Sequence, residues 1–148
     1  MLGELKIGEI DELLKSQVIG RLGCLDGKKV YIIPIGFCFD GEHILGHTSD
    51  GLKMQMMRSN PDVCFQIDHI ENMQNWQSVI LWGTYEELEG YDAKSAMEKF
   101  TARLQRLVTN DKSQTMYGIE AHQFDSGGNK KVVFRIKISE KTGRYEKG

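Results

Sequence analysis

Two Asp-Gly pairs divide the N-terminal half of the chain into segments too short for long helices. Asp26-Gly27 and Asp40-Gly41 stand on either side of the apolar run VYIIPIGFCF, residues 30–39. Asp-Gly is typical of two-residue β-hairpin turns, because glycine adopts a positive φ without strain. The flanking segments VIGRLGCL and EHILGHT are also rich in apolar residues. The pattern therefore predicts three consecutive antiparallel strands.

The rest of the chain adds further strands and only a few helices. DVCFQIDHI, WQSVILWGTYEEL and KVVFRIKISEKTGR have the composition of strands, and we expect the last to pair with TMYGIEAHQF across the loop DSGGN. Apolar residues at helical spacing predict a helix over residues 7–17, and Asp92 is the predicted N-cap of a later helix. Short antiparallel strands joined by tight turns predict a mainly β (α+β) fold, a closed β-barrel with helical additions.

Length and charge favour one domain and exclude some classes of partner. The chain has 148 residues without repeats or an evident linker, so we expect residues 1–148 to form a single domain. A net charge of −2 gives no electrostatic reason to expect nucleic acid or an anionic membrane as a partner. No apolar run approaches the length of a membrane span, and the N-terminus lacks a signal peptide's apolar core.

The cysteines indicate neither a disulfide framework nor a zinc site. Cys24, Cys38 and Cys64 stand singly inside apolar runs, without a CxxC pair or a Cys/His cluster. An odd number of isolated cysteines is typical of free thiols in a reducing compartment. We therefore expect no bound metal and a cytoplasmic location.

Residues 47–68, HTSDGLKMQMMRSNPDVCFQID, combine the end of a strand with the start of a helix. The sequence predicts that the strand ends at His47 and that the helix begins at Ser49 and stops before Pro61. Another strand is expected to follow directly. This arrangement would put polar side chains around the N-terminus of one short helix.

That helix start has the groups that bind a phosphate. Backbone N–H groups of a first helical turn attract anions, and Ser49 is a good N-cap. Thr48 and Ser49 add hydroxyl donors, and Lys53 adds a positive charge. The alternative is an ordinary capped helix with a solvated lysine, and the carboxylate of Asp50 would compete with an anion for the same donors.

Two other places in the sequence suit a planar ligand. Proline rarely lies inside a strand, so Pro34 predicts either a bulge or a flat backbone surface, the second supported by nearby Gly36. On the strand that contains NWQSV, Trp76 and Ser78 share one face and Gln77 faces the other. Trp76 would be either a core residue or an aromatic wall for a heteroaromatic ring.

These segments follow one another in the same order as in a known protein family. GRLG, VYIIPIGF, HTSDGLK, MRSNPDVCFQID and NWQSVILWG, between residues 18 and 88, are similar to the FMN-binding split-barrel proteins of the pyridoxamine 5′-phosphate oxidase superfamily. Within that superfamily the chain most resembles the small nitroimidazole-resistance (Nim-type) flavoproteins. The resemblance implies a six-stranded antiparallel split β-barrel with a few peripheral helices.

The resemblance also implies a homodimer with FMN at its interface. The strand around Ile33, Pro34 and Ile35 would offer backbone groups to the edge of the isoalloxazine ring. His47 and Thr48 would end the next strand beside the cofactor.

The remaining cofactor-binding residues implied by the resemblance lie on either side of the helix. Lys53 would hold the phosphate, and Trp76, Gln77 and Ser78 match the segment that closes the site. Pyridoxamine phosphate oxidase itself has an arginine immediately before the lysine, whereas this chain has Leu52 there. One phosphate ligand is therefore missing unless another basic residue replaces it.

Other departures argue against oxidation of vitamin B6. The chain lacks the basic residues that flank the flavin-binding strand of that enzyme, and its C-terminal EKTGRYEKG has no tryptophan-and-arginine substrate segment. Arg21 is the basic residue that could replace the arginine missing at Leu52 as a ligand of the phosphate.

The favoured hypothesis is an FMN-dependent reductase of nitroaromatic or similar small electron acceptors. His47 is the candidate proton donor, because histidine titrates near neutral pH, although a structural role for it is the alternative. No GxGxxG sequence is present, so NADH, NADPH and a protein reductant are all open as electron donors. The competing hypothesis is a non-catalytic flavin carrier or a haem-binding split-barrel protein, with His47 as a candidate axial ligand.

Overall fold

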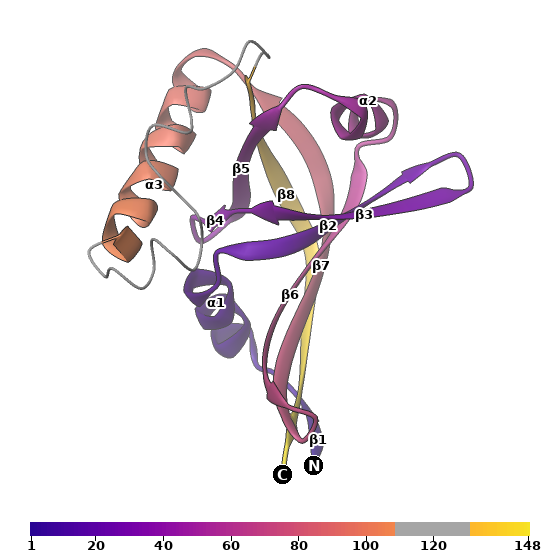
Figure 1. Cartoon of the computed structure of the whole chain (residues 1–148), viewed down its shortest axis with the longest axis vertical. Coiled ribbons are helices and arrows are strands. Elements are labelled where there is room, and N and C mark those ends of the chain that lie inside the picture. Colours follow the sequence, from indigo (N-terminus) through magenta and orange to yellow (C-terminus); the bar gives the residue numbers. More distant parts are fainter. Residues whose placement is uncertain (109–130) are drawn as a thin grey trace.

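The structure, a computed structural model, describes residues 1–108 and 131–148 (Figure 1). The predicted strand TMYGIEAHQF and the loop DSGGN lie outside the described residues. The elements in chain order are β1 (Leu2–Glu4), α1 (Ile7–Ser16), β2 (Ile19–Asp26), β3 (Lys29–Gly36), β4 (Cys38–Phe39), β5 (His43–Ser49), α2 (Leu52–Ser59), β6 (Asp62–Asn72), β7 (Asn75–Leu88), α3 (Gly90–Val108) and β8 (Lys131–Lys147).

The strands form one antiparallel sheet whose order is β3-β2-β6-β7-β8-β5-β4, with β1 paired to β8. Figure 1 shows β6, β7 and β8 running along the longest axis of the molecule toward the end where both termini lie. The mainly β architecture with a few helices is confirmed. The prediction of a closed barrel is wrong, because the path of paired strands ends at β3 and β4. The described sheet has eight strands, so the count of six is unconfirmed.

Phe37 explains why the two ends of the sheet are nevertheless close in sequence. It is the one residue between β3 and β4, and its N–H donates to the carbonyl of Val18 at 3.0 Å. Its buried ring packs edge-on against Phe65, with ring centroids 5.0 Å apart. The chain therefore leaves its pairing with β2 at Phe37 and pairs with β5 immediately afterwards.

The main core fills the space between the inner face of the curved sheet and helices α1 and α2. Phe65 and Phe134 are the largest fully buried side chains of its strands, and Leu14 and Met54 are among those that the helices contribute. A Cβ atom at Gly20 would lie 2.2 Å from the Phe65 ring, so this position has room only for glycine. A second, smaller cluster joins α3 to β4 and β5 on the other side of β5.

The predicted helix over residues 7–17 is confirmed as α1, but two predicted helix starts are wrong. Helix α2 begins at Leu52 rather than Ser49, and Gly51 is its N-cap residue. Strand β5 continues past His47 because its pairing with β8 extends to Ser49 opposite Lys131. A residue held in that ladder is not available to cap a helix.

Helix α3 begins at Gly90, so Asp92 lies inside its first turn instead of capping it. An acidic side chain in the first turn still interacts favourably with the helix dipole. Among the described residues, no helix is long and apolar enough to cross a membrane.

Candidate functional site

A cavity of about 570 Å³ lies where β3, the end of β5 and the start of α2 meet. Four of the predicted cofactor-binding residues line it together: Ile33, Pro34, Thr48 and Lys53. Ser49, Gly51 and Leu52 also line it on the side of the helix. We call this cavity the β3–α2 pocket. Its residues come from three segments, β3, the end of β5 and the start of α2, which the family resemblance also placed around one cofactor.

The polar groups of the β3–α2 pocket suit an anion. Thr48 and Ser49 carry hydroxyl groups, and the half-buried Lys53 carries an ammonium group. No carboxylate belongs to the residues that line the pocket in the described part of the chain. Burial lowers the pKa of Lys53, and a bound anion would stabilise its charged form. The donor set therefore fits a phosphate group.

Strand β3 gives the pocket a backbone edge. It is the last strand of the sheet path, so within the described residues one of its edges has no strand partner. Its register with β2 is continuous from Lys29 to Gly36, so Pro34 causes no bulge and the bulge interpretation is wrong. Proline suits an edge strand because it has no N–H to donate. The side chain of Ile35 is buried in the core, so its backbone alone is available to a ligand.

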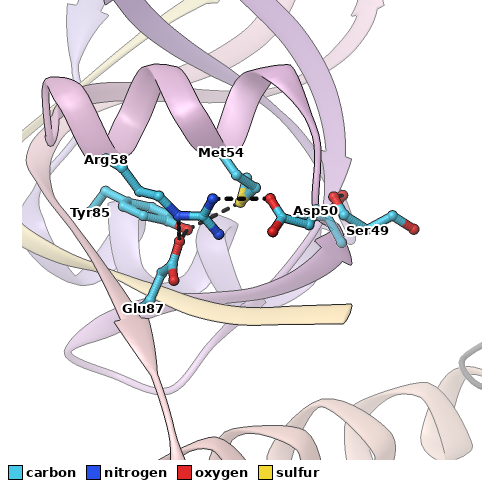
Figure 2. A network of polar contacts seen from close by, with 7 residues as sticks. Ser49, Asp50, Met54, Arg58, Tyr85 and Glu87 are labelled. Carbon is cyan, nitrogen blue, oxygen red and sulfur yellow. Dashed lines mark hydrogen bonds and ion pairs between the residues drawn. The ribbon is translucent and has the colours of Figure 1, made fainter. Parts of the chain in front are cut away.

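Asp50 does not line the β3–α2 pocket although its neighbours Ser49 and Gly51 do. Figure 2 shows its carboxylate turned toward Arg58 in the last turn of α2. Arg58 Nη1 donates to Asp50 Oδ1 at 3.1 Å. The carboxylate therefore has a cationic partner away from the helix N-terminus. In this arrangement it does not compete with an anion for the N–H donors of the first helical turn.

Arg58 itself is held from the other side by strand β7. Its Nε donates to Oε1 of Glu87, and the hydroxyl of Tyr85 donates to the same oxygen at 2.9 Å (Figure 2). The Tyr85 hydroxyl also contacts Met54 Sδ at 3.1 Å. Burial and the neighbouring Glu87 carboxylate raise the pKa of Tyr85, so the phenol stays protonated and donates. These side chains form a connected polar network behind the pocket.

His47 lies on the opposite face of β5 from Thr48 and does not line the β3–α2 pocket. Its ring packs edge-on against Phe100 of α3, with ring centroids 4.9 Å apart and an interplanar angle of 79°. Burial, and then the charge of Lys131, lower the pKa of His47 to about 4. The imidazole is therefore neutral at pH 7. Of its two predicted roles, this packing favours the structural one.

Trp76, Gln77 and Ser78 are not beside Lys53 in a single chain. Trp76 and Gln77 line another cavity of about 780 Å³, which also includes Tyr145 near the C-terminal end of β8. Ser78 Oγ accepts a hydrogen bond from Gln66 Nε2 at 3.1 Å. One chain therefore brings together only part of the predicted site.

Arg21 occupies a position next to β3 rather than inside the β3–α2 pocket. It lies directly opposite Pro34 in the β2–β3 ladder. Its guanidinium forms an ion pair with Asp68 at 3.3 Å, and Gln66 donates to the same carboxylate oxygen at 3.0 Å. The network continues to Ser78 through Gln66. Arg21 thus belongs to a polar strip across β2, β6 and β7 that consists of Arg21, Gln66, Asp68 and Ser78.

The polar strip crosses a sheet face that carries several exposed apolar side chains. We define the outer sheet face as the exposed surface of β2, β3, β6 and β7. Large apolar side chains on it are between 39% and 66% exposed: Ile19, Leu25, Val30, Ile32 and Trp82. A shallow cavity of about 440 Å³ on this face is lined by several of them. Exposed apolar patches of this kind are typical of protein interfaces.

Sequence reasoning missed Tyr31 and Arg58. Tyr31 lines the β3–α2 pocket beside Ile33, and strand alternation puts these two residues on one face, so a signal was present. Arg58 gave no such signal. Arg58 lies on α2 and contacts Asp50, eight positions earlier, and Glu87 on strand β7, and neither spacing belongs to a local helical pair.

Known proteins are similar to this chain along most of its length. A family model described as pyridoxamine 5′-phosphate oxidase matches residues 7–145. The uncharacterised protein RA0666 of Rhizobium meliloti (strain 1021) is 30% identical over 134 residues, which cover 85% of this chain and 83% of that protein.

Solved structures share the fold over nearly the whole chain. A FAD-binding protein from Mesorhizobium loti is 26% identical, with a TM-score of 0.75 over 100% of this chain and 98% of the other. A Bacteroides thetaiotaomicron protein proposed to confer 5-nitroimidazole antibiotic resistance has a TM-score of 0.72 over 98% of this chain and 87% of the other; at 15% identity it supports the fold alone. The chain therefore belongs to the pyridoxamine 5′-phosphate oxidase family, as its sequence motifs predicted.

Proposed function

We propose that the protein binds a flavin in the β3–α2 pocket. The observation that carries this proposal is the meeting of Ile33, Pro34, Thr48 and Lys53 around one cavity of about 570 Å³. The sequence motifs and the family resemblance predict these same residues as cofactor ligands. The FAD-binding protein from Mesorhizobium loti, which shares the fold at 26% identity, supports a flavin as the ligand class.

The phosphate of the flavin would bind at the start of α2. Thr48, Ser49 and Lys53 offer donors there, and the first backbone N–H groups of a helix attract anions. The ring system would lie against β3, where the free edge around Ile33, Pro34 and Ile35 offers backbone groups. A bound flavin supplies the redox chemistry, while the chain binds it, orients it and excludes water.

FMN is the proposed form of the flavin. The pocket has one lysine and two hydroxyl groups at the helix start, which suit a terminal phosphate better than a pyrophosphate that carries adenosine. FAD is the competing ligand, because the Mesorhizobium loti relative is described as FAD-binding. Fluorescence titration of the apoprotein with both flavins tests the proposal: tighter binding of FMN supports it, and equal or tighter binding of FAD contradicts it.

We further propose a homodimer in which each flavin contacts both chains. The outer sheet face has the exposed apolar side chains that an interface would cover. In a two-fold dimer, Trp76, Gln77 and Ser78 from a second copy would complete the site that one chain leaves open. Sedimentation at micromolar concentration, with and without FMN, tests this arrangement.

The proposed activity is reduction of a nitroaromatic or similar small electron acceptor. The fold shared with the Bacteroides thetaiotaomicron protein is compatible with this activity. A flavin carrier without turnover is the alternative from a different class. Anaerobic reduction of the flavin-loaded protein, followed by mixing with a nitroimidazole, separates the two: a carrier would reoxidise no faster than free flavin.

Haem binding is less well supported than flavin binding. No histidine belongs to the described residues that line the β3–α2 pocket, and His47 packs against Phe100 instead. A visible absorption spectrum of the purified protein distinguishes the two cofactors directly. The cytoplasmic location also stays a prediction, in keeping with three free cysteines.

A further inference from the structure

The polar network behind the β3–α2 pocket links the loop before α2 to strand β7. Figure 2 shows Arg58 between two carboxylates, with Asp50 on one side and Glu87 on the other. Asp50 belongs to the loop that lines the pocket, whereas Glu87 is near the end of β7. Tyr85 donates a further hydrogen bond to Glu87. Arg58 therefore connects the pocket loop to a fixed strand.

The direction of the Asp50 side chain has an electrostatic consequence. Ser49 and Gly51 face the pocket, so a carboxylate between them lies within a few ångströms of the proposed phosphate site. Pairing with Arg58 turns that carboxylate away and neutralises its charge. Without Arg58, a negative charge would be free to approach the same N–H donors and the same lysine.

We propose that Arg58 is a positioning residue for the phosphate end of the flavin site. It holds Asp50 away from the anion and fixes the backbone of residues 49–51 through its second contact with Glu87. The planar guanidinium can bind two carboxylates at once in a defined geometry, which the single ammonium group of lysine does less well. This inference rests on the proposed flavin site.

A purely structural salt bridge would behave differently. The side chains of Arg58, Asp50 and Glu87 are between 32% and 39% exposed, and ion pairs at such sites contribute little to folding stability. A positioning role instead affects the ligand, and only the part of the ligand that carries the phosphate. Riboflavin has the same ring system as FMN but no phosphate, so the two ligands separate the roles.

The experiment compares the dissociation constants of FMN and riboflavin for the full chain by fluorescence titration. Arg58→Gln is expected to weaken FMN binding roughly 10-fold, the usual scale for repulsion by one nearby like charge. The dissociation constant of riboflavin is expected to change less than about 2-fold. Asp50→Asn alone should leave FMN affinity unchanged or higher. The double variant Arg58→Gln/Asp50→Asn should recover most of the lost affinity, because the repelling carboxylate is gone.

Arg135→Gln is the matched control. Arg135 forms an equally exposed ion pair with Glu86, and neither residue lines the β3–α2 pocket. It should change neither dissociation constant. Thermal unfolding of each variant checks that the fold is intact.

The proposal is overturned if Arg58→Gln weakens FMN and riboflavin equally or leaves both unchanged. It is also overturned if the double variant shows no recovery, or if Asp50→Asn weakens FMN binding. Should Arg58→Gln fail to fold, the Asp50→Asn result and Arg58→Lys, expected to lose FMN affinity and not riboflavin affinity, decide the question. A parent protein that binds neither flavin would instead overturn the proposed function itself.

Discussion

Thr48 and His47 are neighbours in β5 but face opposite sides of the strand, one toward the β3–α2 pocket and the other toward Phe100 of α3. This alternation is a property of any strand. It separates the two residues that the family resemblance placed together beside the cofactor. The consequence is that Thr48 is available to a ligand in the pocket, while His47 joins α3 to the sheet.

The first prediction concerns replacement of His47. Because its ring packs against Phe100, His47→Asn should lower the free energy of unfolding by about 1 kcal/mol, the range of aromatic pair contacts. FMN affinity and the rate of nitroaromatic reduction should stay close to those of the parent. Urea unfolding and stopped-flow reoxidation across pH measure these effects. A loss of roughly 100-fold in the reoxidation rate at unchanged FMN affinity would instead restore the proton-donor role.

The second prediction is a pH effect on stability from the same histidine. The pKa of His47 falls from 6.5 to about 4 on folding, so the unfolded chain binds more protons between these values. The contribution of neutral His47 is therefore fully present above about pH 6.5 and is lost as pH falls toward 4. Urea unfolding at several pH values should show a smaller decrease over this range in His47→Asn. Parallel curves for the two proteins would contradict the assignment.

The third prediction concerns the phosphate ligands. Lys53→Ala should weaken FMN binding by about 1–3 kcal/mol, the usual cost of a lost charge-assisted hydrogen bond, with a much smaller effect on riboflavin. Lys94→Ala, on the exposed surface of α3, is the control. Calorimetric titration measures both. An unchanged FMN affinity in Lys53→Ala would remove this lysine from the site.

The fourth prediction concerns Leu52, which stands where pyridoxamine phosphate oxidase has an arginine before its phosphate-binding lysine. Leu52 lines the β3–α2 pocket and is 63% exposed, so an arginine there would meet no steric obstacle in the core. Leu52→Arg should bind FMN roughly 10-fold more tightly through a second cationic contact. Leu52→Gln controls for loss of the apolar side chain. Equal affinities in Leu52→Arg and Leu52→Gln would show that the phosphate lies elsewhere.

The fifth prediction tests the outer sheet face. Ile32 is 65% exposed there, and Ile32→Glu should convert the proposed dimer into a monomer and weaken FMN binding, since a buried charge without a partner opposes association. Tyr91→Glu is the control, because Tyr91 is 83% exposed on α3, away from this face. Sedimentation velocity at micromolar concentration measures the assembly. A monomer that retains the parent's FMN affinity would contradict a site shared between two chains.

Local sequence information was enough to predict most of the elements. Hairpins formed at Asp26-Gly27 and Asp40-Gly41, because a hairpin depends on a few adjacent residues, although the single strand predicted over residues 30–39 is divided at Phe37 into β3 and β4. Helix α1 formed over the apolar pattern that predicted it. The residues Ile33, Pro34, Thr48 and Lys53 were also found from short motifs and from the family resemblance, and they do line one pocket.

Long-range pairing decided what the local patterns got wrong. Ser49 was a credible N-cap in the sequence, but it pairs with Lys131, a residue that lies more than eighty positions away. That pairing extends β5 and moves the start of α2 to Leu52. The sheet likewise ends at β3 and β4 because Phe37 turns into the core between them.

The tertiary structure alone decided which polar groups act together. The contacts of Arg58 with Asp50 and Glu87 depend on where the fold brings the end of α2 relative to Glu87 of β7, and no short motif encodes that position. By itself, the sequence determined most strands, their turns and the residue types at the proposed phosphate site, since these depend on neighbours along the chain. The tertiary structure decided the direction of each side chain at that site, because burial and charge pairing depend on neighbours in space.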